Sequence, residues 1–200
     1  HIISKKLKTK IYGFYRSSGY LKLLKKKHRN KINFLKIDLT SYENTFNGLK
    51  ICKPDLIFHL ASNADVRGSF DQPLLHTKNN TSITANLLEA VRRQKINPLI
   101  IICSTSEVYG NVKRKDMPIK ENQMIAPINP YAVTKTYQDL LSQVYASSFN
   151  LKIIITRMFS YTNARRKNLF QTAFAMQIAR CEKKLQKTIR HGNLDSVRTF

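Results

Sequence analysis

Short apolar runs alternate along this chain with longer segments in which apolar residues recur every three or four positions. The short runs are typical of buried strands, and the periodic segments are typical of helices packed on one face. In the clearest periodic segment, Ile83, Leu87, Leu88 and Val91 share one face. Strands are predicted at residues 10–15, 32–37, 55–60, 98–103 and 151–159, and helices at residues 20–28, 42–51, 77–95 and 131–149. Continuous Ile, Leu and Phe runs separated by helices predict an α/β fold with a doubly wound parallel sheet covered on both faces.

The composition supports a folded domain and indicates no membrane or metal partner. Hydrophobic residues make up 42% of the 200 positions, which is enough for a core. The longest apolar run, residues 99–103, is far shorter than the about 20 residues that span a bilayer. No signal pattern follows His1, so a cytoplasmic location is expected. Cys52, Cys103 and Cys181 are widely spaced without a CxxC pair, which is typical of reduced cysteines and predicts no metal site.

The formal net charge of +23 leaves three interpretations open. Residues 1–37 contain no Asp or Glu. Such a basic segment can bind nucleic acid, can bind a small phosphate-bearing ligand, or can form a solvated surface. No helix-turn-helix, zinc or RNP pattern is present, so nucleic acid is not the expected partner.

Two polar motifs lie where a parallel sheet binds ligands. The stretch "STSEVYG" at residues 104–110 follows directly on a predicted buried strand. Hydroxyls and a carboxylate are costly to bury without partners, and ligands bind beyond the carboxyl ends of parallel strands. Tyr131 and Lys135 are four positions apart at the start of a predicted helix, which puts them on one face. A nearby ammonium lowers the pKa of a tyrosine, so the pair is a candidate proton-transfer site.

Five stretches occur in the order that characterises one known family. They are "HLAS" at 59–62, "NLLEAVR" at 86–92, "STSEVYG" at 104–110, "NPYAVTK" at 129–135 and "GNLDSVRTF" at 192–200. With them the chain resembles the extended short-chain dehydrogenase/reductase family, in its nucleotide-sugar epimerase and dehydratase branch. It is most similar to the GDP-mannose 4,6-dehydratase group, through "STSE", "RMFSYTNARR" at 157–166 and "GNLDSVR". The resemblance implies a Rossmann-like NAD(P)-binding domain over residues 1–160 and the beginning of a sugar-nucleotide-binding portion over residues 161–200.

The resemblance also implies roles for four catalytic residues. Tyr131 would take the proton of the sugar 4-hydroxyl while hydride leaves C4 for the nicotinamide, and Lys135 would stabilise the phenolate and bind the nicotinamide ribose. Thr105 would share the hydrogen bond to the 4-hydroxyl. In a dehydratase, Glu107 would remove the C5 proton so that water leaves from C6. The alternative for Glu107 is a surface glutamate in a turn, and the alternative reactions are 4-epimerisation, 4-keto reduction and decarboxylation.

For the cofactor, the resemblance implies NADP, with NAD as the alternative. Arg16 and Ser17 stand where an acidic residue would select NAD, and an arginine suits a 2′-phosphate. The expected cofactor contacts are Arg16, Ser17, Asp38, Leu39, Leu60, Ala61, Tyr131 and Lys135. Asp38 has the alternative role of a turn or cap residue.

For the substrate, the resemblance implies a sugar nucleotide, GDP-mannose above all, and a homo-oligomeric full-length protein. The expected contacts are Ser62, Asn80, Ser106 and Arg198, with Arg165 and Arg166 as weaker candidates. The family's "FN-H" after the last predicted strand is replaced by Ser160 and Tyr161, which leaves guanosine recognition open.

The chain departs from the family at both ends. None of its six glycines forms the family's G-x-x-G-x-x-G turn, and the family continues past Phe200. A fragment is therefore expected, lacking a central first strand between residues 10–15 and 55–60 and the glycine-rich turn after it. A degenerate domain that binds no dinucleotide is the alternative.

Overall fold

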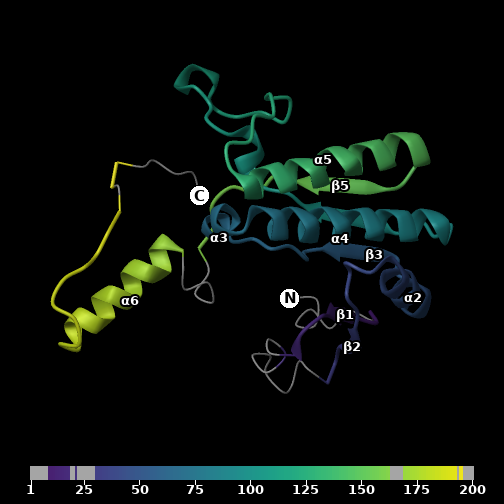
Figure 1. Cartoon of the computed structure of the whole chain (residues 1–200), viewed down its shortest axis with the longest axis horizontal. Helices are drawn as coiled ribbons and strands as arrows, with labels where there is room; N and C mark the ends of the chain where they lie inside the picture. Colours follow the sequence, from purple (N-terminus) through teal and green to yellow (C-terminus); the bar gives the residue numbers. More distant parts are fainter. Residues whose placement is uncertain (1–8, 19–20, 22–29, 163–168, 193, 196–200) are drawn as a thin grey trace. The chain divides into compact units, whose positions relative to one another are not determined.

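The computed structural model describes residues 9–18, 21, 30–162, 169–192 and 194–195 (Figure 1). The chain divides into two compact units, residues 1–157 and residues 158–200, which are described separately.

Five short parallel strands form two sheets in the first unit. β1 (Tyr12–Tyr15) pairs with β2 (Asn33–Lys36), while β3 (Leu56–His59), β4 (Leu99–Cys103) and β5 (Ile153–Thr156) form a second sheet in the order β3-β4-β5. All three strand pairs are parallel. The α/β prediction and all five predicted strands are confirmed. The last strand is shorter than predicted, because it ends at Thr156 and Arg157 turns its side chain to a buried carboxylate.

Three of the predicted helices are present. They are α2 (Tyr42–Cys52), α4 (Pro73–Arg93) and α5 (Pro130–Phe149). The helix expected at residues 20–28 lies almost wholly outside the described residues. Four elements were not predicted: α3 (Val66–Asp71), α6 (Phe170–Glu182) and the short 3-10 helices η2 (Ser106–Tyr109) and η3 (Arg114–Asp116). Each of the three short ones holds at most six residues, too few to show a helical period.

The ends of the long helices follow from local sequence. Ser41 begins α2 by accepting a hydrogen bond from the Asn44 backbone N–H. The helix α5 starts with Pro130 in its first turn, where a missing N–H costs nothing, and stops at Asn150, whose φ of 53° is left-handed. Asparagine tolerates that conformation better than most residues.

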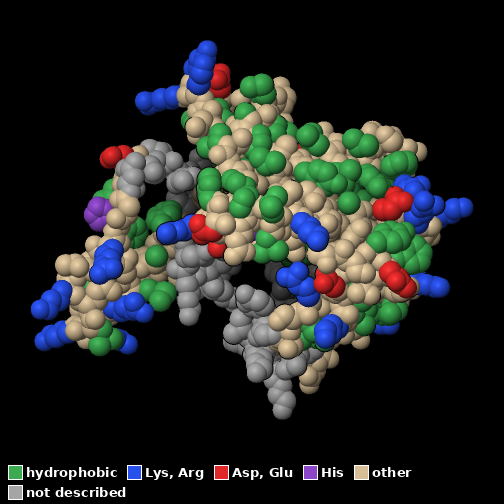
Figure 2. Space-filling model, viewed as in Figure 1, with side chains coloured by type: hydrophobic (Ala, Val, Ile, Leu, Met, Phe, Trp, Pro, Cys, Tyr) green, Lys and Arg blue, Asp and Glu red, His purple; other side chains and the backbone are tan. Residues whose placement is uncertain are grey.

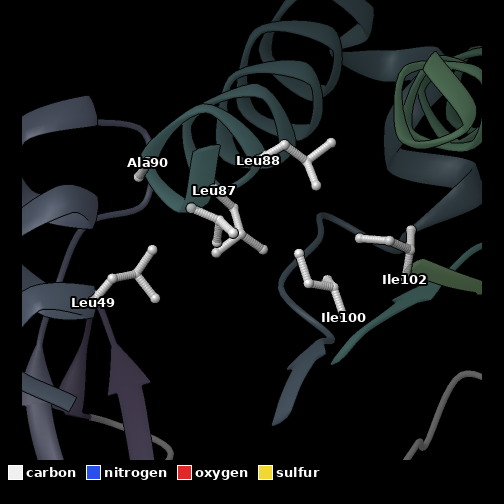
Figure 3. Close-up of a cluster of buried hydrophobic side chains, with 7 residues drawn as sticks. Leu49, Leu87, Leu88, Ala90, Ile100 and Ile102 are labelled. Atoms are coloured by element: carbon white, nitrogen blue, oxygen red, sulfur yellow. The ribbon is translucent and has the colours of Figure 1, made fainter. Parts of the chain in front are cut away.

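The core of this unit lies between α4, the strands and α2 (Figure 3). The predicted apolar face of α4 is confirmed, because Ile83, Leu87, Leu88 and Val91 are all buried. The complete buried cluster is Leu49, Leu87, Leu88, Ala90, Val91, Ile100 and Ile102. Helix α4 thus supports the sheet whose carboxyl edge carries the polar motifs.

The strands β1 and β3 each have an unpaired edge. In the described residues no strand joins the two sheets, and Phe58 on β3 remains 49% exposed. Helix α2 bridges them, since Gly48 packs against the Phe14 ring of β1 and Gln94 at the end of α4 donates to the Phe46 carbonyl.

The surface carries its basic residues over many elements. On the face in Figure 2, Lys and Arg side chains of the described residues are scattered and form no continuous patch. Hydrophobic side chains are also exposed along α5, among them Val133, Tyr137, Leu140 and Val144. Of the helices in the described ranges, none combines the length and apolarity that a membrane crossing requires.

The second unit contains α6, which buries no residue fully. The Gln177 side chain on this helix donates to the Arg190 carbonyl at 3.0 Å and accepts from the Arg190 backbone N–H at 2.7 Å. These two bonds hold the segment after the helix against it.

Candidate active site

The carboxyl end of β4 and the start of α5 are joined by a lysine. Lys135 is 4% exposed, and its Nζ donates to the Cys103 carbonyl oxygen at 2.5 Å. Tyr131 is buried one helical turn earlier on the same helix. The two residues that the sequence pairs are therefore both held inside the protein at the edge where β4 ends.

Burial lowers the pKa of Lys135 to about 8, an effect that the neighbouring Cys103 thiol partly opposes. At neutral pH the ammonium is still the major form. Lys135 thus places a positive charge one helical turn from Tyr131 on α5.

Glu107 lies in η2, directly after β4, and is tied to the same helix. Its Oε2 accepts a hydrogen bond of 3.0 Å from the side-chain amide of Asn129, the residue that caps α5. The Thr105 hydroxyl accepts the Glu107 backbone N–H at 3.3 Å and so begins η2. A hydroxyl that accepts in this way can still donate its own proton. The structure thus brings Glu107 next to the helix that carries Tyr131 and Lys135. Thr105 lies along the chain between β4 and η2.

The first turn of α5 has its backbone donors satisfied by neighbouring side chains. The Tyr131 N–H donates to the Ser69 hydroxyl of α3 at 3.2 Å, and the Ala132 N–H donates to Asn129 Oδ1 at 2.7 Å. Ser69 is fully buried. Sequence reasoning missed both Ser69 and Asn129; the Asn-Pro pair before a helix was the only available signal, and it indicates a cap.

Asn80 lies on α4, with its side chain next to the loop that follows β3. It is fully buried; its Oδ1 accepts from the Asn63 N–H at 2.7 Å, and its Nδ2 donates to the Asn63 carbonyl and to Thr134 Oγ1. The amide links the loop after β3 to α5, and the contact of Asn80 with the substrate stays a prediction.

Three of the expected cofactor contacts, Arg16, Ser17 and Asp38, lie near the end of β1 and after β2. Arg16 and Ser17 are exposed, and Arg16 donates to Asn79 Oδ1 at 3.2 Å. Asp38 Oδ1 accepts from the hydroxyl and the backbone N–H of Thr40, and these bonds lower the pKa of Asp38, with a smaller contribution from the Arg16 charge. Asp38 is thus engaged in a turn, the alternative that the sequence left open.

The other expected contacts differ in exposure. Leu60 and Ala61 after β3 are exposed, Leu39 and Ser106 are half-buried, and the Leu39 carbonyl accepts from the Asn86 amide. Arg198, Arg165 and Arg166 lie outside the described residues. The Ser62 hydroxyl is buried after β3 and has no hydrogen-bond partner among the described residues. A buried hydroxyl at the carboxyl edge of the sheet is suited to a polar ligand there.

A buried polar network behind the site was not predicted. His59 Nε2 and Thr84 Oγ1 are 2.9 Å apart, and Gln138 Nε2 donates to Thr84 at 2.6 Å. Burial, with the Lys135 charge as a second cause, lowers the pKa of His59 to about 3, so the ring is neutral. Nothing in the apolar run around His59 signals this network. Among the described residues, His, Cys, Asp and Glu form no group of three that could hold a metal.

The parallel sheet and the paired Tyr131 and Lys135 place the chain in the class of short-chain dehydrogenases/reductases. A family model described as GDP-mannose 4,6 dehydratase matches residues 4–200, and the chain belongs to this family.

Three known proteins are similar to this chain in sequence or in fold. The GDP-mannose 4,6-dehydratase of Yersinia enterocolitica is 32% identical over 169 residues, covering 82% of this chain and 44% of the relative. The structure of RMD from Pseudomonas aeruginosa complexed with NADPH has a TM-score of 0.70 and 27% identity, covering 78% of this chain and 53% of the other. The structure of the UDP-glucose 4-epimerase of Thermus thermophilus in complex with NAD has a TM-score of 0.76 and 23% identity. The match covers 92% of this chain and 57% of the epimerase chain. The chain spans about half the length of the curated relatives it matches.

Proposed function

We propose that the protein carrying this chain is an NADP-dependent nucleotide-sugar 4,6-dehydratase that acts on GDP-mannose. The observation that carries the proposal is the 3.0 Å contact between Glu107 and Asn129, which holds a second proton-transfer group beside the helix of Tyr131 and Lys135. A reaction with two separate proton removals needs two bases, and this arrangement supplies both.

Different residues would remove the protons at the 4-hydroxyl and at C5 of the sugar. A bound nicotinamide supplies the hydride acceptor and donor. Tyr131 as phenolate takes the proton of the 4-hydroxyl, while the Lys135 ammonium stabilises that phenolate. Thr105 orients the hydroxyl through its remaining proton. Once C4 is a ketone the C5 proton is acidic, and Glu107 would remove it and pass it to the C6 hydroxyl, which leaves as water. The hydride taken from C4 would then return to C6 while a solvent-exchangeable proton adds at C5, so that the cofactor is not consumed.

The cofactor proposal is a nicotinamide dinucleotide, with NADP favoured over NAD. Similar structures contain NADPH or NAD. Arg16 is exposed and carries a positive charge beyond β1, where a 2′-phosphate can pair with a guanidinium. Arg16, Ser17 and Lys135 would hold the dinucleotide. The Ser62 hydroxyl, which has no hydrogen-bond partner within the described part of the chain, supports a polar ligand at this edge.

A second candidate is a 4-epimerase or 4-keto reductase acting on another sugar nucleotide. It is favoured by Ser160 and Tyr161, which replace the residues expected for guanosine recognition. In that case Glu107 has no proton to remove from C5.

The test is Glu107→Gln in the active protein, with exchange of the C5 proton for solvent deuterium as the readout. The amide keeps the shape of the side chain but is not a base, so binding of cofactor and sugar nucleotide should persist while exchange is lost. Glu121→Gln, an exposed neighbour on the loop at residues 111–128, is the matched control and should exchange normally. Normal turnover in Glu107→Gln would favour the epimerase or reductase.

A further inference from the structure

Asn129 uses both ends of its side-chain amide. Its Oδ1 accepts the Ala132 N–H at 2.7 Å, and its Nδ2 donates to Glu107 Oε2 at 3.0 Å. The residue is only 9% exposed. A single side chain therefore connects the first turn of α5 with the carboxylate of η2.

The chemistry of the partners fixes the orientation of this amide. A backbone N–H can only donate, so the amide oxygen must face Ala132. The NH2 group then faces Glu107, whose Oε2 is the acceptor. The orientation follows from the two neighbours, and a rotated amide would lose both bonds.

The backbone on either side of this contact is also constrained. Pro130 follows Asn129 and has a fixed φ, and the Tyr131 N–H is held by Ser69. On the other side, Thr105 holds the Glu107 N–H. Asn129 thus joins two rigid turns, one with Tyr131 and one with Glu107.

We propose that Asn129 is a positioning residue that sets the Glu107 carboxylate relative to Tyr131. The proposal rests on the proposed function, in which Glu107 is the base at C5. By holding Oε2, the amide directs the other oxygen, Oε1, which has no hydrogen bond within the described ranges, to receive the proton. Two bases that act in turn on adjacent carbons need a fixed separation, and misplacement by about 1 Å can cost about 100-fold in rate.

The substitution Asn129→Ser separates this role from helix capping. Serine caps a helix about as well as asparagine, but it cannot donate across the gap to Glu107. In the active protein we expect a melting midpoint lowered no more than in the cap variant Ser41→Ala, a KM within about twofold and a kcat reduced about 100-fold. Asn129→Asp also keeps the helix cap, but its kcat should fall further than that of Asn129→Ser, because it places a second carboxylate next to Glu107. Ser41→Ala, which removes the cap of α2 away from the site, is the control and should lower stability without lowering kcat.

Two further measurements decide whether the effect passes through Glu107. In a Glu107→Gln background, Asn129→Ser should cause no additional loss of the residual kcat, since residues that act as one unit are not additive. A kcat for Asn129→Ser within about twofold of wild type, or a full additional loss in the double variant, would overturn the proposal.

The contact itself is testable without turnover. In the NMR spectrum of the chain, the side-chain amide protons of Asn129 should shift when Glu107 is replaced by alanine and should not shift in Glu121→Ala. Unshifted signals in Glu107→Ala overturn the positioning proposal whatever the reaction is. A clear shift together with normal turnover of Glu107→Gln would instead overturn the dehydratase function and the catalytic part of the proposal, while the contact stands.

Discussion

Arg157 at the end of β5 binds the buried carboxylate of Asp139 with two hydrogen bonds, Nε to Oδ2 at 2.8 Å and an Nη to Oδ1 at 3.0 Å. The Asp139 side chain has no exposed surface. The same guanidinium donates to the Tyr109 hydroxyl at 3.0 Å and to the Glu121 carbonyl at 2.8 Å. One cation therefore fastens α5, η2 and the loop at residues 111–128 to the end of the sheet.

Removing that cation should be strongly destabilising. Arg157→Leu leaves Asp139 charged and buried without its partner, which costs about 3–5 kcal/mol. Burial raises the pKa of Asp139, but the hydrogen bonds from Arg157 and Gln143 outweigh burial and the net pKa is lowered. The urea denaturation free energy is the measurement, with Arg114→Leu on the exposed loop as the control. A loss below about 1 kcal/mol for Arg157→Leu would contradict the buried ion pair as described.

Acid should destabilise the fold through His59. Its folded pKa of about 3 is below the ordinary value of 6.5, so the unfolded chain binds the proton more tightly. The folding stability that depends on neutral His59 is therefore fully present above about pH 6.5. It is lost as the pH falls toward 3, by up to about 1.4 kcal/mol per pH unit. Denaturation curves between about pH 7 and pH 4 should show a shallower decline in His59→Gln than in wild type. His191→Gln, at an exposed position, should leave the wild-type slope; equal slopes for all three proteins would contradict the prediction.

The buried charge of Lys135 should lower the free energy of unfolding. The unfolded lysine has its ordinary pKa of 10.5 and the folded one about 8, so the unfolded state binds more protons between these values and stability rises with pH there. Lys135→Met removes the buried charge and should stabilise the protein by up to roughly 3 kcal/mol at about pH 7. In Lys135→Met the increase in stability between about pH 8 and pH 10.5 should disappear, and turnover should be abolished. Thermal melts at about pH 7 and pH 10 provide the measurement, and a lower melting point of Lys135→Met at neutral pH would count against it.

The core prediction concerns α4. Leu88 is fully buried in the cluster of Figure 3, so Leu88→Ala should cost about 2–5 kcal/mol through lost contacts and a cavity. Leu74 on the same helix is 84% exposed, and Leu74→Ala should change stability by less than about 0.5 kcal/mol. Similar losses in both variants would show that α4 does not pack as described.

The sheet and the helices α2, α4 and α5 could be predicted because their signals are local, whereas α6, which buries no residue fully, was not predicted. The face formed by Ile83, Leu87, Leu88 and Val91 needs only the helical period, and the strands need only continuous apolar runs. The short η2 escaped the prediction because its four residues contain no period. Its conformation comes from the Thr105 cap and from Tyr109 held by Arg157, a residue 48 positions away.

The site could be predicted in its residue types but not in its internal contacts. Tyr131, Lys135 and Glu107 were found through motif and order. The roles of Asn129 and Asn80 could not be found, because both are set by partners far along the chain: Asn129 contacts Glu107, and Asn80 contacts Thr134, 54 positions later. An asparagine in a sequence does not show whether its amide faces a ligand or another element.

The most direct test of the proposed function follows two labels through one turnover of the active protein. GDP-mannose carrying tritium at C4 is incubated with the protein and NADP in deuterated water, and the product is analysed by position. We expect a 4-keto-6-deoxy sugar with the tritium at C6, one deuterium at C5 and no net change in NADPH. Inversion at C4 without deuterium at C5, or stoichiometric reduction of the added NADP, would contradict it.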